Sequence, residues 1–564
     1  MLLASSSTTL GATTYTPKCD AINLRTGPST SYARKTMVNE GARLTVVATV
    51  SGGHYSVKCA GSWRVGSGWH RISAINGRSV KSLYGVTYLY AAKKLFRIVI
   101  NPTPAPTKTP AAAPVTAPPT AAPTAAATTA PSTGPGATTA PSVTPAPTAA
   151  PTPWPGPTFV KGRINLPANV TFYGRGWGHG VGMSQYGAYG RALDGQLAPG
   201  ILTHYYQGTT LGTTTNKQVR VLVLQSYAAS ATNPVQVFGR GATWSIDGIA
   251  KTFPADARLK FIPTTTNGAT TWKAVVTAVD GKTLHSGGTS GSISVRPGSG
   301  TLLQLWSKPS AYDRYRGVLR IIGKTGSSAT ANVVNELPME TYLRGVVPAE
   351  VSASWPAEAV KAQAIAARSY AAYRLHPTTG TFDVYDTTQS QVYYGKGIEK
   401  AGSDAAIAAT ANVVLRTPGG GIANTLFHST GGGATENNDN VFVSETGKKV
   451  AGVFSYLRGS SDRRPDGSSF DEASAHATWR TDTYARADLQ AWFAADARTN
   501  VGTLVAIDLS DRGVSGRLIS VILIGANGTT KTVSGSVFRE VFNNHRPSGS
   551  RQMRSTLFDL KAIP

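Results

Sequence analysis

The sequence predicts an α+β protein with a small all-β domain at its amino end. Three observations support this fold class. Short runs rich in Val, Ile and Thr, broken by Gly, Pro and Ser, fill much of residues 1–100. Strand-like runs such as "QVRVLVLQSY" and "GVLRIIG" recur over residues 218–330, which gives a β-rich part. An alanine-rich helical pattern then follows Asn335 and predicts a helical core.

The composition also sets the domain boundaries. At 564 residues the chain is too long for one ordinary core, so several domains are expected. Residues 101–158 are almost wholly Pro, Ala and Thr, with Lys108 as the only charge. Such a segment has no apolar periodicity to bury, and its prolines block helix and sheet. We therefore predict domains at 1–100 and 159–564, joined by a linker at 101–158.

The charge is strongly positive. The chain carries 55 Lys and Arg against 29 Asp and Glu, a net charge of +26. A field of this sign favours polyanions, which include nucleic acid, an anionic membrane surface and an acidic cell-wall polymer. No zinc knuckle, RNA-recognition signature or basic helical arm is present, so the pattern argues against nucleic acid.

The amino-terminal segment carries the only two cysteines, Cys19 and Cys59. They form either a disulfide, if the protein leaves the cytoplasm, or two buried thiols. The first residues, "MLLASSSTTLGA", show no evident signal peptide, and no stretch approaches a transmembrane segment. Any evidence for export therefore lies in the rest of the chain.

The same segment contains "INLRTGPSTSY", "GARLTVV" and "GWHRI". These motifs resemble bacterial SH3-like domains, small β-barrels that commonly bind cell-wall components. The resemblance implies that this basic domain tethers the protein to peptidoglycan or to anionic wall polymers. The alternative for Trp63 and Trp69 is ordinary barrel core.

Two glutamates stand eight residues apart in "RGVVPAEVSASWPAEAVKAQAIAARSYAAYR". Pro356 suits a first helical position, and Glu358 then falls in the opening turn of a helix, where a carboxylate is stabilised. Glu350 lies between Pro348 and Pro356, so we expect it on a connection between two helices. Its apolar neighbours favour a raised pKa and a general acid, although a solvent-facing loop glutamate has the same spacing.

On the predicted helix, Lys361, Ile365 and Arg368 share one face, which by itself favours a surface cation at Arg368. The stretch "NELPMETYLRGVVPAEVSASWPAEAVKAQAIAARSYAA" closely resembles the core of the stage II sporulation protein D family, which includes amidase-enhancer proteins. Active members are lytic transglycosylases that cut peptidoglycan glycan strands. The resemblance implies that Glu350 is catalytic and that Arg368 is also functionally important.

A glycine-rich motif, "GRGWGHGVGMSQYGAYGRAL", has glycine at every second position from 174 to 182. In an extended chain this period would place all the glycines on one face, open to a sugar chain. Ser184 is a good N-cap for a helix that begins at Gln185. The motif recurs in the same family, which implies substrate binding by Gly178, His179, Gly180, Ser184 and Gln185.

Two further segments, "FDVYDTTQSQVYYG" and "LFHSTGGGATENNDNVF", are similar to family segments. The resemblance implies polar contacts to substrate from Gln391, Tyr393, His428, Ser429 and Thr430. Some members bind zinc here through a histidine and cysteines. This chain has no cysteine near His428, so we predict no metal and no cofactor.

One well-placed carboxylate fits a lytic transglycosylase that acts on peptidoglycan glycan strands outside the cell or in its wall. One alternative is a non-catalytic wall protein that enhances a cell-wall amidase. Another is a muramidase that uses water, which requires a second carboxylate. The candidates for that second group are Asp383, Asp386, Glu436 and Asp439.

Overall fold

The computed structural model describes residues 13–19, 22–38, 42–59, 62–76, 78–98, 159–326, 329–376 and 379–563. The chain divides into two compact units, Met1–Pro151 and Thr152–Pro564. The predicted linker at 101–158 lies outside the described residues. In the described ranges, no helix is long and apolar enough to cross a membrane.

The first unit is a small β domain, as the strand-like runs predict. Its sheet has the order β3-β2-β7-β5-β4-β1-β8, with β6 paired to β5. The strands are β1 (Thr13–Pro17), β2 (Ile22–Arg25), β3 (Arg34–Val38), β4 (Leu44–Cys59), β5 (Ser62–Ile75), β6 (Arg78–Ser79), β7 (Leu89–Ala92) and β8 (Phe96–Ile98), with a short helix α1 (Val80–Tyr84). Its identity as an SH3-like domain remains a prediction.

The structure shows the roles of one tryptophan and of both cysteines in this domain. Trp69 is buried, meets Tyr55 edge-on at 5.4 Å between ring centroids, and donates its indole N–H to the Gly53 carbonyl at 2.8 Å. Trp69 is therefore barrel core rather than an exposed binding residue. Cys19 and Cys59 form a disulfide across 40 residues of sequence. A domain this small has little core of its own, so the cross-link adds to its stability.

The predicted β-rich part lies in the second unit and contains two sheets. A seven-stranded sheet has the order β17-β16-β21-β24-β25-β14-β26, and a six-stranded sheet has the order β20-β19-β18-β15-β22-β23. The first comprises β14 (Gln218–Ala228), β16 (Trp244–Ile246), β17 (Thr252–Phe253), β21 (Ser292–Pro297), β24 (Val318–Gly323), β25 (Thr330–Pro338) and β26 (Val384–Tyr385). The second comprises β15 (Val235–Arg240), β18 (Arg258–Thr266), β19 (Ala269–Thr277), β20 (Thr283–Thr289), β22 (Leu302–Leu305) and β23 (Arg314–Tyr315).

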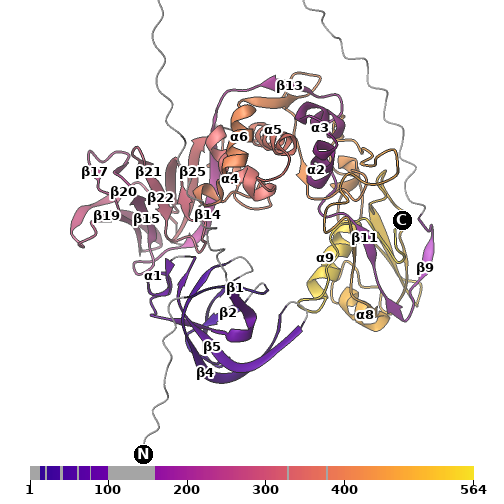
Figure 1. Cartoon of the computed structure of the whole chain (residues 1–564), viewed down its shortest axis with the longest axis horizontal. Coiled ribbons are helices and arrows are strands. Elements are labelled where there is room, and N and C mark those ends of the chain that lie inside the picture. The colour runs from indigo at the N-terminus through magenta and orange to yellow at the C-terminus, as the bar shows by residue number, and fades with distance from the viewer. Residues whose placement is uncertain are drawn as a thin grey trace, which may run out of the picture. The chain divides into compact units, whose positions relative to one another are not determined.

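Helices α4 (Met339–Glu350), α5 (Ala357–Tyr373) and α6 (Ala401–Ala409) lie beside this β-rich part, and α2 (Gln185–Leu193) and α3 (Ala198–Tyr205) lie on the other side of α5 (Figure 1). Helix α5 is buried on two sides. Ala364 and Ala367 belong to the core of the β-rich part, and Ala362 and Ala366 pack with α2 and α3. Small side chains on both faces let neighbouring elements approach closely, so α5 is the central helix of the unit.

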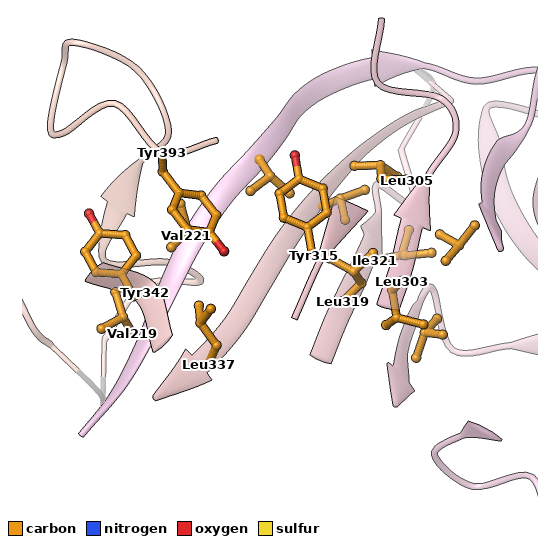
Figure 2. Close-up of a cluster of buried hydrophobic side chains, with 14 of the residues drawn as sticks. Val219, Val221, Leu303, Leu305, Tyr315, Leu319, Ile321, Leu337, Tyr342 and Tyr393 are labelled. Atoms are coloured by element: carbon orange, nitrogen blue, oxygen red, sulfur yellow. The ribbon is translucent and has the colours of Figure 1, made fainter. Parts of the chain in front are cut away.

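Helix α4 is fixed to the sheet by aromatic packing. Tyr342 of α4 and Tyr393 stack at 5.3 Å, and Figure 2 shows both rings beside Val219 and Val221 of β14. This contact joins the rigid sheet to the helix that carries Glu350 at its end.

The carboxyl-terminal part forms a further core. A four-stranded sheet has the order β33-β32-β31-β9, and a three-stranded sheet has the order β29-β11-β34. These elements are β9 (Arg163–Asn165), β11 (Tyr173–Arg175), β29 (Thr478–Arg480), β31 (Leu504–Asp508), β32 (Ser520–Gly525), β33 (Thr530–Ser534) and β34 (Phe558–Asp559), with α7 (Asn438–Val441), α8 (Arg486–Ala494) and α9 (Gly535–His545). Three strand pairs complete the unit: β10 (Asn169–Val170) with β30 (Tyr484–Ala485), β12 (Met183–Ser184) with β28 (Phe427–His428), and β13 (Thr210–Thr213) with β27 (Val413–Arg416).

Two local expectations were wrong. Helix α4 continues through Pro348 to Glu350 instead of ending before the proline. Pro348 lies in the last turn, where it removes only one helical hydrogen bond, the one to the Arg344 carbonyl. The glycine motif is not extended either, because Gly176, Gly178, Gly180 and Gly182 all have positive φ between 69° and 104°.

Candidate active site

Glu350 is the last residue of α4, and its partly buried carboxyl group is held by two donors. The Val392 N–H donates to Oε1 at 3.0 Å. The Gln185 amide donates to Oε2 at 3.4 Å, although the two residues are 165 positions apart in sequence. Helix α4, the segment after β26 and the start of α2 therefore meet at this carboxyl group.

Burial is the main electrostatic influence on Glu350. It raises the pKa of the carboxyl group above its ordinary value, and the two hydrogen bonds oppose this only in part. No cation pairs with Glu350 in the described part of the chain. Burial is also the main cause of the raised pKa of Tyr342, Tyr370 and Tyr394, and the charge of Glu350 adds to each shift. A carboxyl group in such surroundings keeps its proton to higher pH than an exposed glutamic acid does, which suits a general acid.

The N-cap of α2 places Gln185 in this site. Ser184 Oγ accepts from the Gly187 N–H at 3.1 Å, which confirms the predicted cap. The same oxygen accepts from the Gly431 N–H at 3.1 Å. One buried hydroxyl thus fixes the start of α2 and ties the glycine motif to the "HSTGGG" segment.

The glycine motif and the "HSTGGG" segment run side by side. Strands β12 and β28 are parallel, with Ser184 opposite His428, and the Tyr186 N–H donates to the Ser429 carbonyl at 3.0 Å. A side chain at Gly180 would lie 2.3 Å from the Arg517 guanidinium, so only glycine fits there. The glycines therefore serve left-handed backbone and close packing.

His179 and His428 face each other, with ring centroids 5.4 Å apart. Burial, and then the charge of Arg517, lowers the pKa of His179 to about 4, and burial places the pKa of His428 well below its ordinary value. His179 Nδ1 accepts from the Val181 N–H at 3.0 Å, and His428 Nδ1–H donates to the Val181 carbonyl at 3.2 Å. Both imidazoles are therefore neutral. The described residues contain no group of three His, Cys, Asp or Glu arranged to hold a metal.

Arg368 is fully buried, so the spacing-based expectation of a surface cation is wrong. Its guanidinium forms a two-pronged ion pair with Glu340 at 2.7 and 2.8 Å. It also donates to the Val413 carbonyl at 3.1 Å and the Ile407 carbonyl at 3.3 Å. Arg368 therefore joins α5 to α4, α6 and β27 and makes no contact with Glu350.

Gln391 and Tyr393 are buried as well. Gln391 accepts from the Tyr342 hydroxyl at 3.1 Å, and Tyr393 donates its hydroxyl to Asn335 at 2.7 Å. Both flank Val392, so they position the backbone N–H that binds Glu350. Of the predicted "HSTGGG" contacts, Thr430 is buried and bonded to Ser474, whereas Ser429 is partly exposed.

Glu358 has the structural role predicted for it. It lies in the first turn of α5, pairs with Lys361 at 2.7 Å and accepts from the Ala198 N–H, the first of α3, at 2.8 Å. These contacts lower the pKa of Glu358. The surroundings of Glu350 thus favour its protonated form, and those of Glu358 favour its charged form.

The site contains groups that sequence reasoning missed. The backbone N–H of Val392 binds Glu350, but a backbone group is present at almost every residue, so the sequence does not mark it. Tyr370 and Tyr394, whose pKa values are raised mainly by burial and further by the charge of Glu350, are not its neighbours in sequence. The "QVYYG" motif did mark the region, but not which of its atoms reach the carboxyl group.

Each of the four candidates for a second carboxylate is bound to a cation or to backbone N–H groups. Asp383 pairs with Arg220 at 2.8 Å, and Asp386 pairs with Lys308. Asp439 pairs with Arg458 at 2.6 Å and Lys449 at 2.8 Å. Glu436 is buried and accepts from the backbone N–H groups of Val514 and Ser515 at 3.0 and 2.9 Å.

The fold and site define an α+β protein in which a protonatable carboxyl group, that of Glu350, is held at the meeting point of three segments. Residues 327–416, which include Glu350 and Arg368, match the family model described as stage II sporulation protein. The resemblance seen in the motifs is thereby supported over this part of the chain.

Two of three curated relatives carry names that agree with this match. The chain is 44% identical over 115 residues to an uncharacterised protein of Brachyspira hyodysenteriae, covering 20% of this chain and 31% of the relative. It is 38% identical over 109 residues to the amidase enhancer of Bacillus subtilis, covering 19% and 14%. It is 52% identical over 42 residues to stage II sporulation protein D of Bacillus subtilis, covering 7% and 12%. The chain thus spans less than a third of the length of each of these relatives.

Proposed function

We propose that this protein remodels the bacterial cell wall as a lytic transglycosylase that cuts peptidoglycan glycan strands, with Glu350 as general acid and base. The observation that carries the proposal is the state of Glu350. Its carboxyl group has a raised pKa, is held by Val392 and Gln185, and has no paired cation among the residues that the structure describes. General acids in glycosidic cleavage need this combination of fixed geometry and a retained proton.

The reaction needs only one carboxyl group. Glu350 protonates the glycosidic oxygen between N-acetylmuramic acid and N-acetylglucosamine, and the bond from that oxygen to C1 of the muramic acid breaks. The resulting carboxylate then accepts the proton of the 6-hydroxyl of the same muramic acid as O6 bonds to C1. The product is a 1,6-anhydro sugar, water is not consumed, and Glu350 regains its proton.

The surroundings of the other acids favour this route over hydrolysis. A muramidase needs a second free carboxylate near the bond. Asp383, Asp386 and Asp439 are each neutralised by a cation, and Glu436 is bound to backbone N–H groups. Using any of them would first require breaking those contacts.

Arg368 has a supporting role in this proposal. Its ion pair with Glu340 holds α5 against the first turn of α4, the helix that ends at Glu350. It is a positioning residue rather than one that meets the substrate.

A second function is favoured by one observation, the 38% identity to an amidase enhancer. In that case the site would bind glycan without cutting it, and the protein would stimulate an N-acetylmuramoyl-L-alanine amidase. In both cases the basic amino-terminal domain, as an SH3-like module, would bind the wall or its anionic polymers, and the protein would act outside the cell or in its wall.

One experiment separates the two functions. The purified chain is incubated with glycan strands, with and without stem peptides, in the absence of any amidase. A transglycosylase releases shorter strands from at least one substrate by itself. An enhancer leaves both intact and instead raises the rate at which an added amidase releases peptides, an effect that Glu350→Gln would not abolish.

A further inference from the structure

Three aromatic rings gather beside the start of α2. Tyr186 and Tyr189 lie one turn apart on α2, and Trp355 lies on the connection between α4 and α5, five residues after Glu350. The Trp355 ring centroid is 4.9 Å from that of Tyr186 and 5.0 Å from that of Tyr189. We call these three residues the aromatic platform.

The platform is open to solvent at its polar edges. All three side chains are partly exposed. The hydroxyls of Tyr186 and Tyr189 and the indole N–H of Trp355 make no hydrogen bond within the described residues. These three polar groups are also not buried. These polar groups therefore face water. Buried Tyr and Trp side chains usually find a hydrogen-bond partner within the protein, so these three remain available to a ligand.

The platform also has a fixed position relative to Glu350. Tyr186 directly follows Gln185, whose amide binds the Glu350 carboxyl group, and its own N–H is bonded to the Ser429 carbonyl. The rings hold one another in tilted and edge-on contacts, so little side-chain freedom is left to lose on binding.

From this arrangement we infer that the aromatic platform is a sugar-binding subsite, which takes an N-acetylhexosamine of the glycan strand next to the bond at Glu350. The inference rests on the proposed function. A pyranose ring presents C–H groups on its faces, which suit an aromatic ring, and hydroxyl and N-acetyl groups at its rim. The rim groups match the free hydroxyls of Tyr186 and Tyr189 and the indole N–H of Trp355.

The test measures binding without turnover. The full chain carrying Glu350→Gln is titrated with a short, peptide-free glycan oligosaccharide, and the dissociation constant is measured by calorimetry. We expect Trp355→Ala or Tyr186→Ala, added to this background, to weaken binding about tenfold, the loss typical of one aromatic anchor. Trp355→Phe keeps a flat ring and should retain most of the affinity.

Trp306→Ala is the matched control. Trp306 is also a partly buried tryptophan, and its ring contacts that of Phe238 with 5.5 Å between the centroids, but it lies in the β-rich part. It should leave the affinity unchanged. Equal affinities in the Trp355→Ala, Tyr186→Ala and Trp306→Ala chains would overturn the subsite, as would a loss in Trp355→Phe as large as in Trp355→Ala. Because binding is read without cleavage, failure of the chain to cut glycan would refute the transglycosylase and leave this result interpretable.

Discussion

Removing the guanidinium of Arg368 should destabilise the helical core rather than only slow a reaction. Arg368 is fully buried and makes four hydrogen bonds, two to Glu340 and one each to the Val413 and Ile407 carbonyls. Arg368→Met fills similar space but leaves the Glu340 carboxylate and two carbonyls without these donors. Breaking one side of a buried ion pair typically lowers the free energy of unfolding by about 3–5 kcal/mol.

The assay is urea unfolding of the full chain, followed by tryptophan fluorescence. Arg368→Met should shift the unfolding midpoint of the second unit well below that of the parent. Lys361→Met is the matched control on the same helix. It removes a partly exposed pair with Glu358, so its effect should stay below about 1 kcal/mol.

One result would refute this reasoning. If Arg368→Met kept the parent's unfolding midpoint and lost only cleavage, Arg368 would have to meet the substrate directly. The structural account of the ion pair with Glu340 would then be wrong.

Three further predictions concern the glycine motif, the acid and the small β domain. Gly180→Ala should destabilise the second unit more than Gly195→Ala in urea unfolding, because both glycines have positive φ but only at Gly180 would the new methyl group meet a side chain, that of Arg517. If Glu350 must be protonated to act, the cleavage rate should fall as pH rises through its raised pKa. Because the Gln185 amide lowers that pKa, Gln185→Leu should move this fall to higher pH in a pH–rate profile, and an unmoved profile would contradict the contact. Reducing the disulfide, which spans 40 residues of sequence, should destabilise the amino-terminal domain by about 4 kcal/mol in thermal unfolding and leave the cleavage of soluble glycan unchanged.

Local signals in the sequence predicted much of the fold. Three features follow from short-range chemistry, and each is present in the structure: the strand-like runs over 218–330, the N-cap at Ser184 and the first-turn position of Glu358. Such features depend on neighbours a few residues away, which the sequence shows directly.

Tertiary packing decided the rest. Pro348 is a helix breaker in isolation, yet α4 passes through it because Tyr342 and neighbouring residues anchor the helix to the sheet. Arg368 resembles a surface cation by spacing and becomes buried only because α4, α6 and β27 close around it. The contact of Gln185 with Glu350 joins residues 165 positions apart, so no local pattern could show it.

The most direct test of the central claim is mass spectrometry of the sugar products from purified glycan strands. The parent chain, Glu350→Gln and the control Glu358→Gln are compared on the same substrate. Our account predicts 1,6-anhydro ends from the parent and from Glu358→Gln, and none from Glu350→Gln. Reducing ends from the parent, or anhydro ends that persist in Glu350→Gln, would contradict it.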